Sequence, residues 1–265
     1  MEKELESLLS WWDVSGVDVP DIKAAPRKKV KPTRATIRQA VEPAKPSTVA
    51  KTLPKDTVSA RADDNAALIE TAKKLAQSAK TLQALQSAIA DFDVGALSDG
   101  ARQSVFSRGN PEAKIMVIGE APGPDEDRQG KPFVGRSGEL LDKIFASIGL
   151  DESSLYVTNI VNWHPRGNRN PTTEDIEICR PLIHRHIELI APETIILVGS
   201  VSMTTLSDRK GITKSRGEWV DIDTGQHKCT GLIIYHPAYL LRQPHLKKET
   251  WRDMLALKNH LETDN

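Results

Sequence analysis

Four short apolar runs recur from residue 114 onwards, and each is followed by polar or glycine-rich residues and then by a helix-like pattern. Apolar runs of this length between helical patterns are typical of buried parallel strands. The strands are expected at 114–119, 155–161, 194–199 and 231–235, and the helices at 137–148, 172–190, 201–206 and 247–261. This alternation predicts a three-layer α/β/α fold with a central four-stranded parallel sheet.

The first 62 residues contain much less core material. Residues 1–16 place Leu5, Leu8, Leu9 and Trp12 on one face of a short amphipathic helix, which is marginal alone and is expected to dock on the rest of the chain or on a protein partner. Residues 17–62 are predicted to be a largely disordered linker. Between residues 23 and 61 they contain five prolines and carry eleven basic and two acidic residues, a net charge of +9. Such a segment attracts polyanions, although it can equally be a spacer.

The remaining residues, 63–265, are expected to form a catalytic domain. Its first element is a helix that Asp63 or Asp64 caps and that continues to Phe92. The chain has two cysteines, which exclude a disulfide framework, and no apolar run approaches the length of a membrane span. We therefore expect a monomer in the cytoplasm, without membrane association.

Polar residues follow the predicted strands at their carboxyl ends, where open α/β sheets bind ligands. They are Glu120, Asn159, Ser200 and His236. The loop after the first strand adds several carboxylates, including Glu126, and lacks the spacing of a phosphate-binding loop. Carboxylates there suit activation of water or stabilisation of a developing cation, and an amide can recognise the edge of a pyrimidine. The alternatives are a solvated turn for the acids and structural roles for the asparagine and the histidine.

The segment after His236 suggests contact with DNA. Tyr239, Leu240 and Leu241 are expected to form an apolar loop tip in the sequence HPAYLLR, flanked by Arg242. An exposed apolar side chain beside a cation is suited to insertion into a base stack.

Three ordered motifs carry a resemblance to a known family. They are GEAPG with EDRQGKPFVGRSG, then VTNIV with PRGNRNPTTED, then HPAYLLR. Together they resemble the signature blocks of the uracil-DNA glycosylase superfamily, and family 4 in particular, over about residues 92–261. The resemblance implies an enzyme of base excision repair that flips uracil out of single- or double-stranded DNA and hydrolyses its N-glycosidic bond.

The resemblance also implies roles for individual residues. Phe133 would stack on the base, Asn159 would bind its pyrimidine edge and His236 would stabilise the departing uracil anion. Glu120, Glu126 and Asn168 are three candidates for orienting the water, and Leu240 would fill the space that the base leaves.

Two departures from the family pattern stand out. Family 4 enzymes hold an iron–sulfur cluster with four cysteines, and here the corresponding positions are Phe92, Gly95, Trp163 and Cys179. One cysteine cannot hold a cluster, so we expect no cofactor. In addition, Ala238 stands where the family usually has serine. Two alternatives to a hydrolase remain: a DNA-binding protein without activity, and the superfamily's cross-linking branch, whose basic insert is missing between Asn159 and Asn170.

Overall fold

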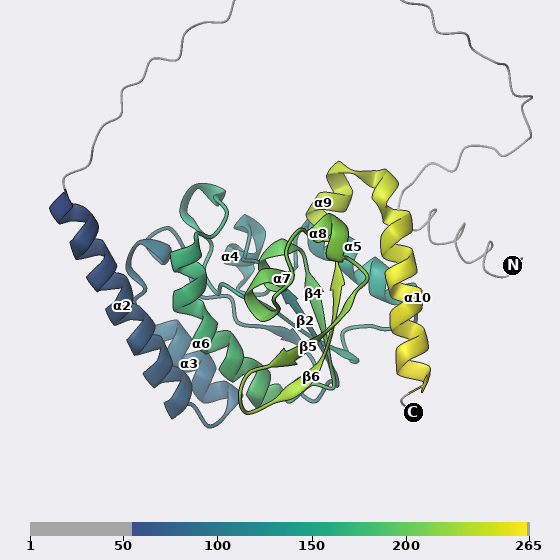
Figure 1. The fold of residues 1–265 in the computed structure, drawn as a ribbon, viewed down its shortest axis with the longest axis horizontal. Coiled ribbons are helices and arrows are strands. Elements are labelled where there is room, and N and C mark those ends of the chain that lie inside the picture. The colour runs from purple at the N-terminus through teal and green to yellow at the C-terminus, as the bar shows by residue number, and fades with distance from the viewer. Residues whose placement is uncertain (1–54, 264–265) are drawn as a thin grey trace, which may run out of the picture.

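The central sheet has six strands in the order β1-β3-β2-β4-β6-β5. A computed structural model describes residues 55–263, with side chains from Asp64 onwards (Figure 1). The four inner strands are parallel, as predicted, whereas the edge strands β1 and β5 run antiparallel to their neighbours and were not predicted. The strands are β1 (Arg108–Gly109), β2 (Ile115–Gly119), β3 (Leu155–Asn159), β4 (Thr194–Val198), β5 (Trp219–Asp223) and β6 (Lys228–Ile234).

Helices cover both faces of the sheet and complete the predicted three layers (Figure 1). Strand β2 shows why both faces are covered: Ile115 and Val117 belong to one buried cluster, whereas Met116 and Ile118 belong to the other. Helices α5 and α10 cover the first face, and α2, α3, α6 and α7 cover the second. The helices are α2 (Lys55–Ser78), α3 (Leu82–Asp91), α4 (Pro124–Gln129), α5 (Arg136–Ala146), α6 (Thr173–Ile190), α7 (Ser200–Leu206), α8 (Ile212–Ser215), α9 (Pro237–Arg242) and α10 (Lys247–Thr263), with short 3₁₀ turns at Gly95–Leu97, Arg166–Asn168 and Pro244–Leu246.

The predicted first helix of the domain is two helices. Helix α2 begins at Lys55, not at Asp63 or Asp64, so the predicted boundary between linker and domain at residue 62 is too late. The chain breaks before α3 because the side chain of Thr81 accepts a hydrogen bond from the backbone N–H of Ala84 at 3.1 Å and caps the new helix. The predicted helix at 1–16 and the linker up to residue 54 lie outside the described residues.

The carboxyl ends of the four parallel strands meet along one edge of the sheet. Gly119, Asn159, Val198 and Ile234 end these strands, and the loops that follow build the pocket described below. Among residues 55–263, no helix combines the length and the apolar character that crossing a membrane requires.

Candidate active site

A cavity of about 580 Å³ opens at this edge of the sheet. All the predicted site residues except Leu240 line it. These lining residues are Glu120, Glu126, Phe133, Asn159, Asn168, Ser200, His236, Tyr239 and Arg242. Four segments at or after the carboxyl ends of the parallel strands supply them, so the topology brings together residues that are far apart in the sequence.

His236 is held as a hydrogen-bond donor. It is the N-cap of α9, and its Nδ1 accepts a hydrogen bond from the backbone N–H of Ala238 at 3.2 Å. Burial lowers the pKa of His236 to about 4, and the positive charge of Arg242 contributes to the same shift. The imidazole is therefore neutral at pH 7, with its proton on Nε2 because Nδ1 is an acceptor.

Asn159 and Phe133 lie against each other beside this histidine. Asn159 is 2% exposed, and its side-chain amide forms no hydrogen bond with any residue whose side chain the structure describes. A Cβ at Gly119 would overlap both the Asn159 amide oxygen and the Phe133 ring, so the glycine makes their close approach possible. The rings of Phe133 and His236 have centroids 5.7 Å apart. A buried amide without a partner inside a pocket indicates a ligand that supplies one.

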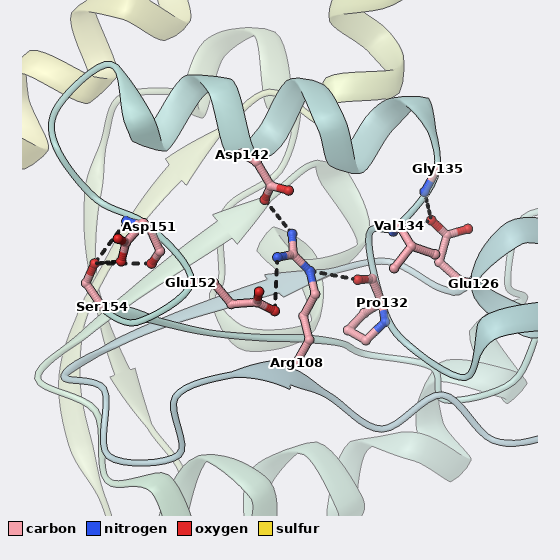
Figure 2. Close-up of polar contacts among 9 residues, drawn as sticks. All are labelled: Arg108, Glu126, Pro132, Val134, Gly135, Asp142, Asp151, Glu152 and Ser154. Atoms are coloured by element: carbon pink, nitrogen blue, oxygen red, sulfur yellow. Dashed lines mark hydrogen bonds and ion pairs between the residues drawn. The ribbon is translucent and has the colours of Figure 1, made fainter.

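The two acids differ in their surroundings. Glu120 lines the cavity without a hydrogen bond or ion pair to another described side chain, and burial raises its pKa. Glu126 accepts three backbone hydrogen bonds, each 3.0 Å long, from Gly123, Val134 and Gly135. Figure 2 shows its carboxylate facing the backbone at Val134 and Gly135. Glu126 therefore holds the loop together, whereas the carboxylate of Glu120 is available to a ligand.

Asn168 belongs to a more exposed loop. It has a left-handed backbone with φ 56°, and its side-chain oxygen lies 3.3 Å from Nε2 of His164. The next residue, Arg169, also lines the cavity and forms an ion pair with Asp175 at 2.5 Å. Asp175 in turn accepts a hydrogen bond from the backbone N–H of Thr172 and completes the capping box of α6.

The prediction of an exposed loop tip after His236 is wrong for Leu240. The segment Pro237–Arg242 is helix α9, and Leu240 is 0% exposed within the core. Pro237 occupies the first helical position, where its fixed φ favours the start of a helix. The exposed leucine is Leu241, which is 37% exposed and shares a helix face with Ala238, a residue that lines the cavity.

The four positions that correspond to cluster ligands do not fit an iron–sulfur cluster. Phe92 and Trp163 pack edge to face with ring centroids 6.2 Å apart, and both are buried. Cys179 is wholly buried, and burial raises the pKa of its thiol to about 12. Among the described residues, no three His, Cys, Asp or Glu side chains are grouped in a way that could bind a metal ion.

Sequence reasoning missed several residues of the cavity. Arg136 and Ser137 at the start of α5, Arg169 and Tyr235 all line it. The first three lie within the recognised motifs and Tyr235 directly precedes HPAYLLR, so proximity to a motif was the one signal in the sequence that could have identified them.

Comparisons with known proteins agree with this geometry. Residues 106–255 match the model of the uracil DNA glycosylase superfamily. The type-4 uracil-DNA glycosylase of Archaeoglobus fulgidus is 40% identical over 146 residues, which are 53% of this chain and 73% of that protein. The type-4 enzyme of Pyrobaculum aerophilum is 33% identical over 178 residues, 65% of this chain and 91% of that protein. The type-5 enzyme of Thermus thermophilus is 30% identical over 149 residues, 48% of this chain and 66% of that protein.

The chain belongs to the uracil DNA glycosylase superfamily. Its similarity to several type-4 enzymes assigns it to family 4 within that superfamily, as the motifs predicted. Its class is that of the uracil-DNA glycosylases, which are hydrolases of DNA repair.

Proposed function

We propose that this protein excises uracil from single- and double-stranded DNA by hydrolysis, leaves an abasic site and turns over without a cofactor. This would be the first step of base excision repair. The observation that carries the proposal is the combination, in one pocket, of a neutral His236 with its proton on Nε2 and a buried Asn159 amide without a partner among the described side chains. A flipped uracil offers complementary groups to both.

The base side of the pocket can bind and activate uracil. Phe133 offers an aromatic face for stacking, and Asn159 offers an amide for the donor and acceptor edge of the base. As the glycosidic bond breaks, the electron pair stays with uracil as an anion. Nε2–H of His236 stabilises the negative charge at O2, and such fixed donors stabilise a transition state because they need no rearrangement.

The sugar side needs negative charge and a water. Glu120 has the free carboxylate that can stabilise the oxocarbenium-like sugar and orient a water toward C1′. Glu126 is engaged by three backbone groups, which favours a positioning role for it. Asn168 lies on the opposite loop and can bind the water or a phosphate.

On the DNA side, the wedge is Leu241 instead of Leu240. Leu241 is exposed on α9 one turn after Ala238, with Arg242 next to it. Tyr239 lies under Arg242, whose guanidinium is 6.0 Å from the ring centroid. An apolar side chain beside a cation at the mouth of the cavity can fill the space left by the extruded base.

One gel assay tests the proposal. Oligonucleotides containing a single uracil, single-stranded or paired with adenine or guanine, are incubated with a small amount of protein and then treated with alkali. Cleavage at uracil with many turnovers is expected, fastest in the order single strand, G·U, A·U, because flipping costs least where the base is unpaired. A stable protein–DNA adduct would instead support the cross-linking branch, and intact DNA would support a binding protein.

A further inference from the structure

Phe133 has a backbone conformation that needs support from its surroundings. Its φ is 53°, in the left-handed region that residues with a side chain rarely adopt, and it is 6% exposed. Such conformations persist where neighbouring groups determine them. A Cβ at Gly138 would overlap the carbonyl oxygen of Phe133, so the start of α5 leaves room for this conformation only because residue 138 is glycine.

Contacts fix the chain on both sides of Phe133. After it, the backbone N–H groups of Val134 and Gly135 donate to the same oxygen of Glu126. Before it, the carbonyl oxygen of Pro132 accepts a hydrogen bond of 3.0 Å from Nε of Arg108. Figure 2 shows the bond between Arg108 and Pro132 and the bond between Gly135 and Glu126.

Arg108 is itself held from three directions. It belongs to the edge strand β1 and pairs with Val157 of β3, so its backbone is part of the sheet. One terminal nitrogen donates to Asp142 of α5 at 2.5 Å, and the other lies 3.6 Å from Glu152. The Arg108 side chain is only 9% exposed. The planar fork of arginine can make these contacts at once, which the single ammonium group of lysine cannot.

We propose that Arg108 is a positioning residue for base binding, which together with Glu126 holds Phe133 in the conformation that stacks on the flipped base. This inference rests on the proposed function of the pocket. Arg108 does not line the cavity. It acts through the carbonyl of Pro132 and the stiffness of the loop, so its loss should affect the binding of the base and leave the DNA contacts of α9 unchanged.

The test compares Arg108→Met with Arg185→Met. Arg185 is the matched control because its Nε also donates to a backbone carbonyl, that of Ala79 at 2.9 Å, and its Nη1 to a carboxylate, that of Glu188 at 3.0 Å, but far from the pocket on α6. We expect Arg108→Met to lower the excision rate on single-stranded uracil DNA and to weaken inhibition by free uracil, each about tenfold. Arg185→Met should change neither. Equal effects of the two substitutions would overturn the proposal.

A double-mutant cycle separates positioning from general stability. In a Phe133→Ala background, Arg108→Met should have no further effect on rate or on uracil inhibition, because the ring that it positions is gone. Effects that simply multiply would contradict the proposal. If Arg108→Met does not fold by circular dichroism, Arg108→Lys serves in the same cycle, with a smaller loss expected.

Failure of the proposed function and failure of the positioning role of Arg108 give different results in two measurements, the release of uracil from DNA and the binding of free uracil. If the unmodified protein releases no uracil from DNA, the proposed function fails. Binding of free uracil measured by calorimetry still tests the role of Arg108, since it does not depend on turnover. Uracil affinity that is the same in the unmodified protein and in Arg108→Met would then overturn the positioning role.

Discussion

Two loops border the pocket, and they are fixed to very different degrees. The loop between β2 and α5 is held by buried groups: Glu126 accepts from three backbone N–H groups, and Arg108 holds the carbonyl of Pro132. In the loop between β3 and α6, residues 166–170 are all exposed. The side-chain contacts that hold this loop are the ion pair of Arg169 with Asp175 and the contact of His164 with Asn168.

The difference corresponds to the proposed role of each loop. In the proposed function, the first loop presents Phe133, which lines the cavity, to the base, a small rigid ligand that must be held in one orientation. The second loop presents Asn168 and Arg169 to the DNA strand, whose backbone varies in shape. A preformed wall lowers the cost of ordering groups on binding, whereas an exposed loop can adjust. We infer that specificity for the base lies in the rigid loop and tolerance of the DNA context lies in the other.

The largest effect is expected from Asn159→Asp. A carboxylate in this buried position replaces an amide donor with an acceptor that repels uracil O4. An unpaired or repelled buried group costs about 1–3 kcal/mol or more, so excision should fall roughly tenfold to hundredfold at least. Single-turnover rates on single-stranded uracil DNA measure this.

Asn162→Ala is the matched control for that substitution. Asn162 is 3% exposed in the segment that follows β3, and its amide donates to the carbonyl of Val105 at 3.1 Å, away from the base. It should lower the melting temperature without a comparable loss of rate. If Asn159→Asp excised uracil at an unchanged rate, Asn159 would not be the residue that binds the uracil edge. New activity on cytosine would support that role.

The substitutions Glu126→Gln and Asp175→Asn test directly whether the two loops differ in how firmly they are held. Both carboxylates accept a hydrogen bond from the backbone N–H of a helix N-cap residue, Gly123 for Glu126 and Thr172 for Asp175, so the substitutions are chemically alike. Glu126→Gln should slow excision about tenfold on every substrate because it loosens the wall that carries Phe133. Asp175→Asn removes a partly exposed ion pair and should change the rate about fivefold or less. Single-turnover rates at saturating DNA check this, and equal losses would contradict the distinction.

Much of the site was predictable because parallel strands carry their carboxyl ends to one edge. Asn159 ends β3, Glu120 directly follows β2, and Ser200 and His236 come two residues after the ends of β4 and β6, so strand recognition alone placed them together. The role of Arg108 could not be predicted, because it depends on contacts with residues 24 and 34 positions away in the sequence. Its strand, β1, has only two residues and leaves no periodic pattern.

Helix α9 shows a second limit. It has six residues, fewer than two turns, so its apolar positions do not reveal which side is buried. Tyr239, Leu240 and Leu241 look equivalent in the sequence. Packing against the core of α5 and α10 selects Leu240 for burial and leaves Leu241 outside.

Leu241→Ala tests whether Leu241 is the exposed wedge residue of α9, and its expected effect depends on the substrate. If Leu241 fills the space of the extruded base, its loss should slow excision from A·U duplexes on the order of tenfold and leave single-stranded uracil unaffected, since no stack is opened there. Leu255→Ala is the matched control, because Leu255 is also 37% exposed but lies on α10, which contributes no residue to the cavity, whereas α9 contributes Ala238, Tyr239 and Arg242. The ratio of single-strand to duplex rates should change only for Leu241→Ala; the same ratio in both variants would rule out the wedge.

The smallest effect on chemistry is expected from removing the basic N-terminal segment. Because α2 begins at Lys55 and packs on α6, the deletion that leaves the domain intact is residues 1–54. Residues 23–54 carry nine basic and one acidic residue, a net charge of +8. If they hold DNA non-specifically, their removal should weaken duplex binding at low salt. It should also flatten the dependence of log affinity on log salt, by about 0.9 for each phosphate that the segment neutralises in the full chain.

Deletion of residues 1–22 is the matched control for this experiment, since it removes the predicted amphipathic helix and keeps every basic residue from Lys23 onwards. Affinity for duplex DNA and single-turnover rates are measured for the three proteins at several salt concentrations. The rate at saturating substrate should be the same in all three, because no described residue before Glu120 lines the cavity. Identical salt slopes in all three proteins would show that the segment is only a spacer. A collapse of the rate in both deletions would show that residues 1–22 belong to the catalytic fold, and a collapse in the longer deletion alone would assign that role to residues 23–54.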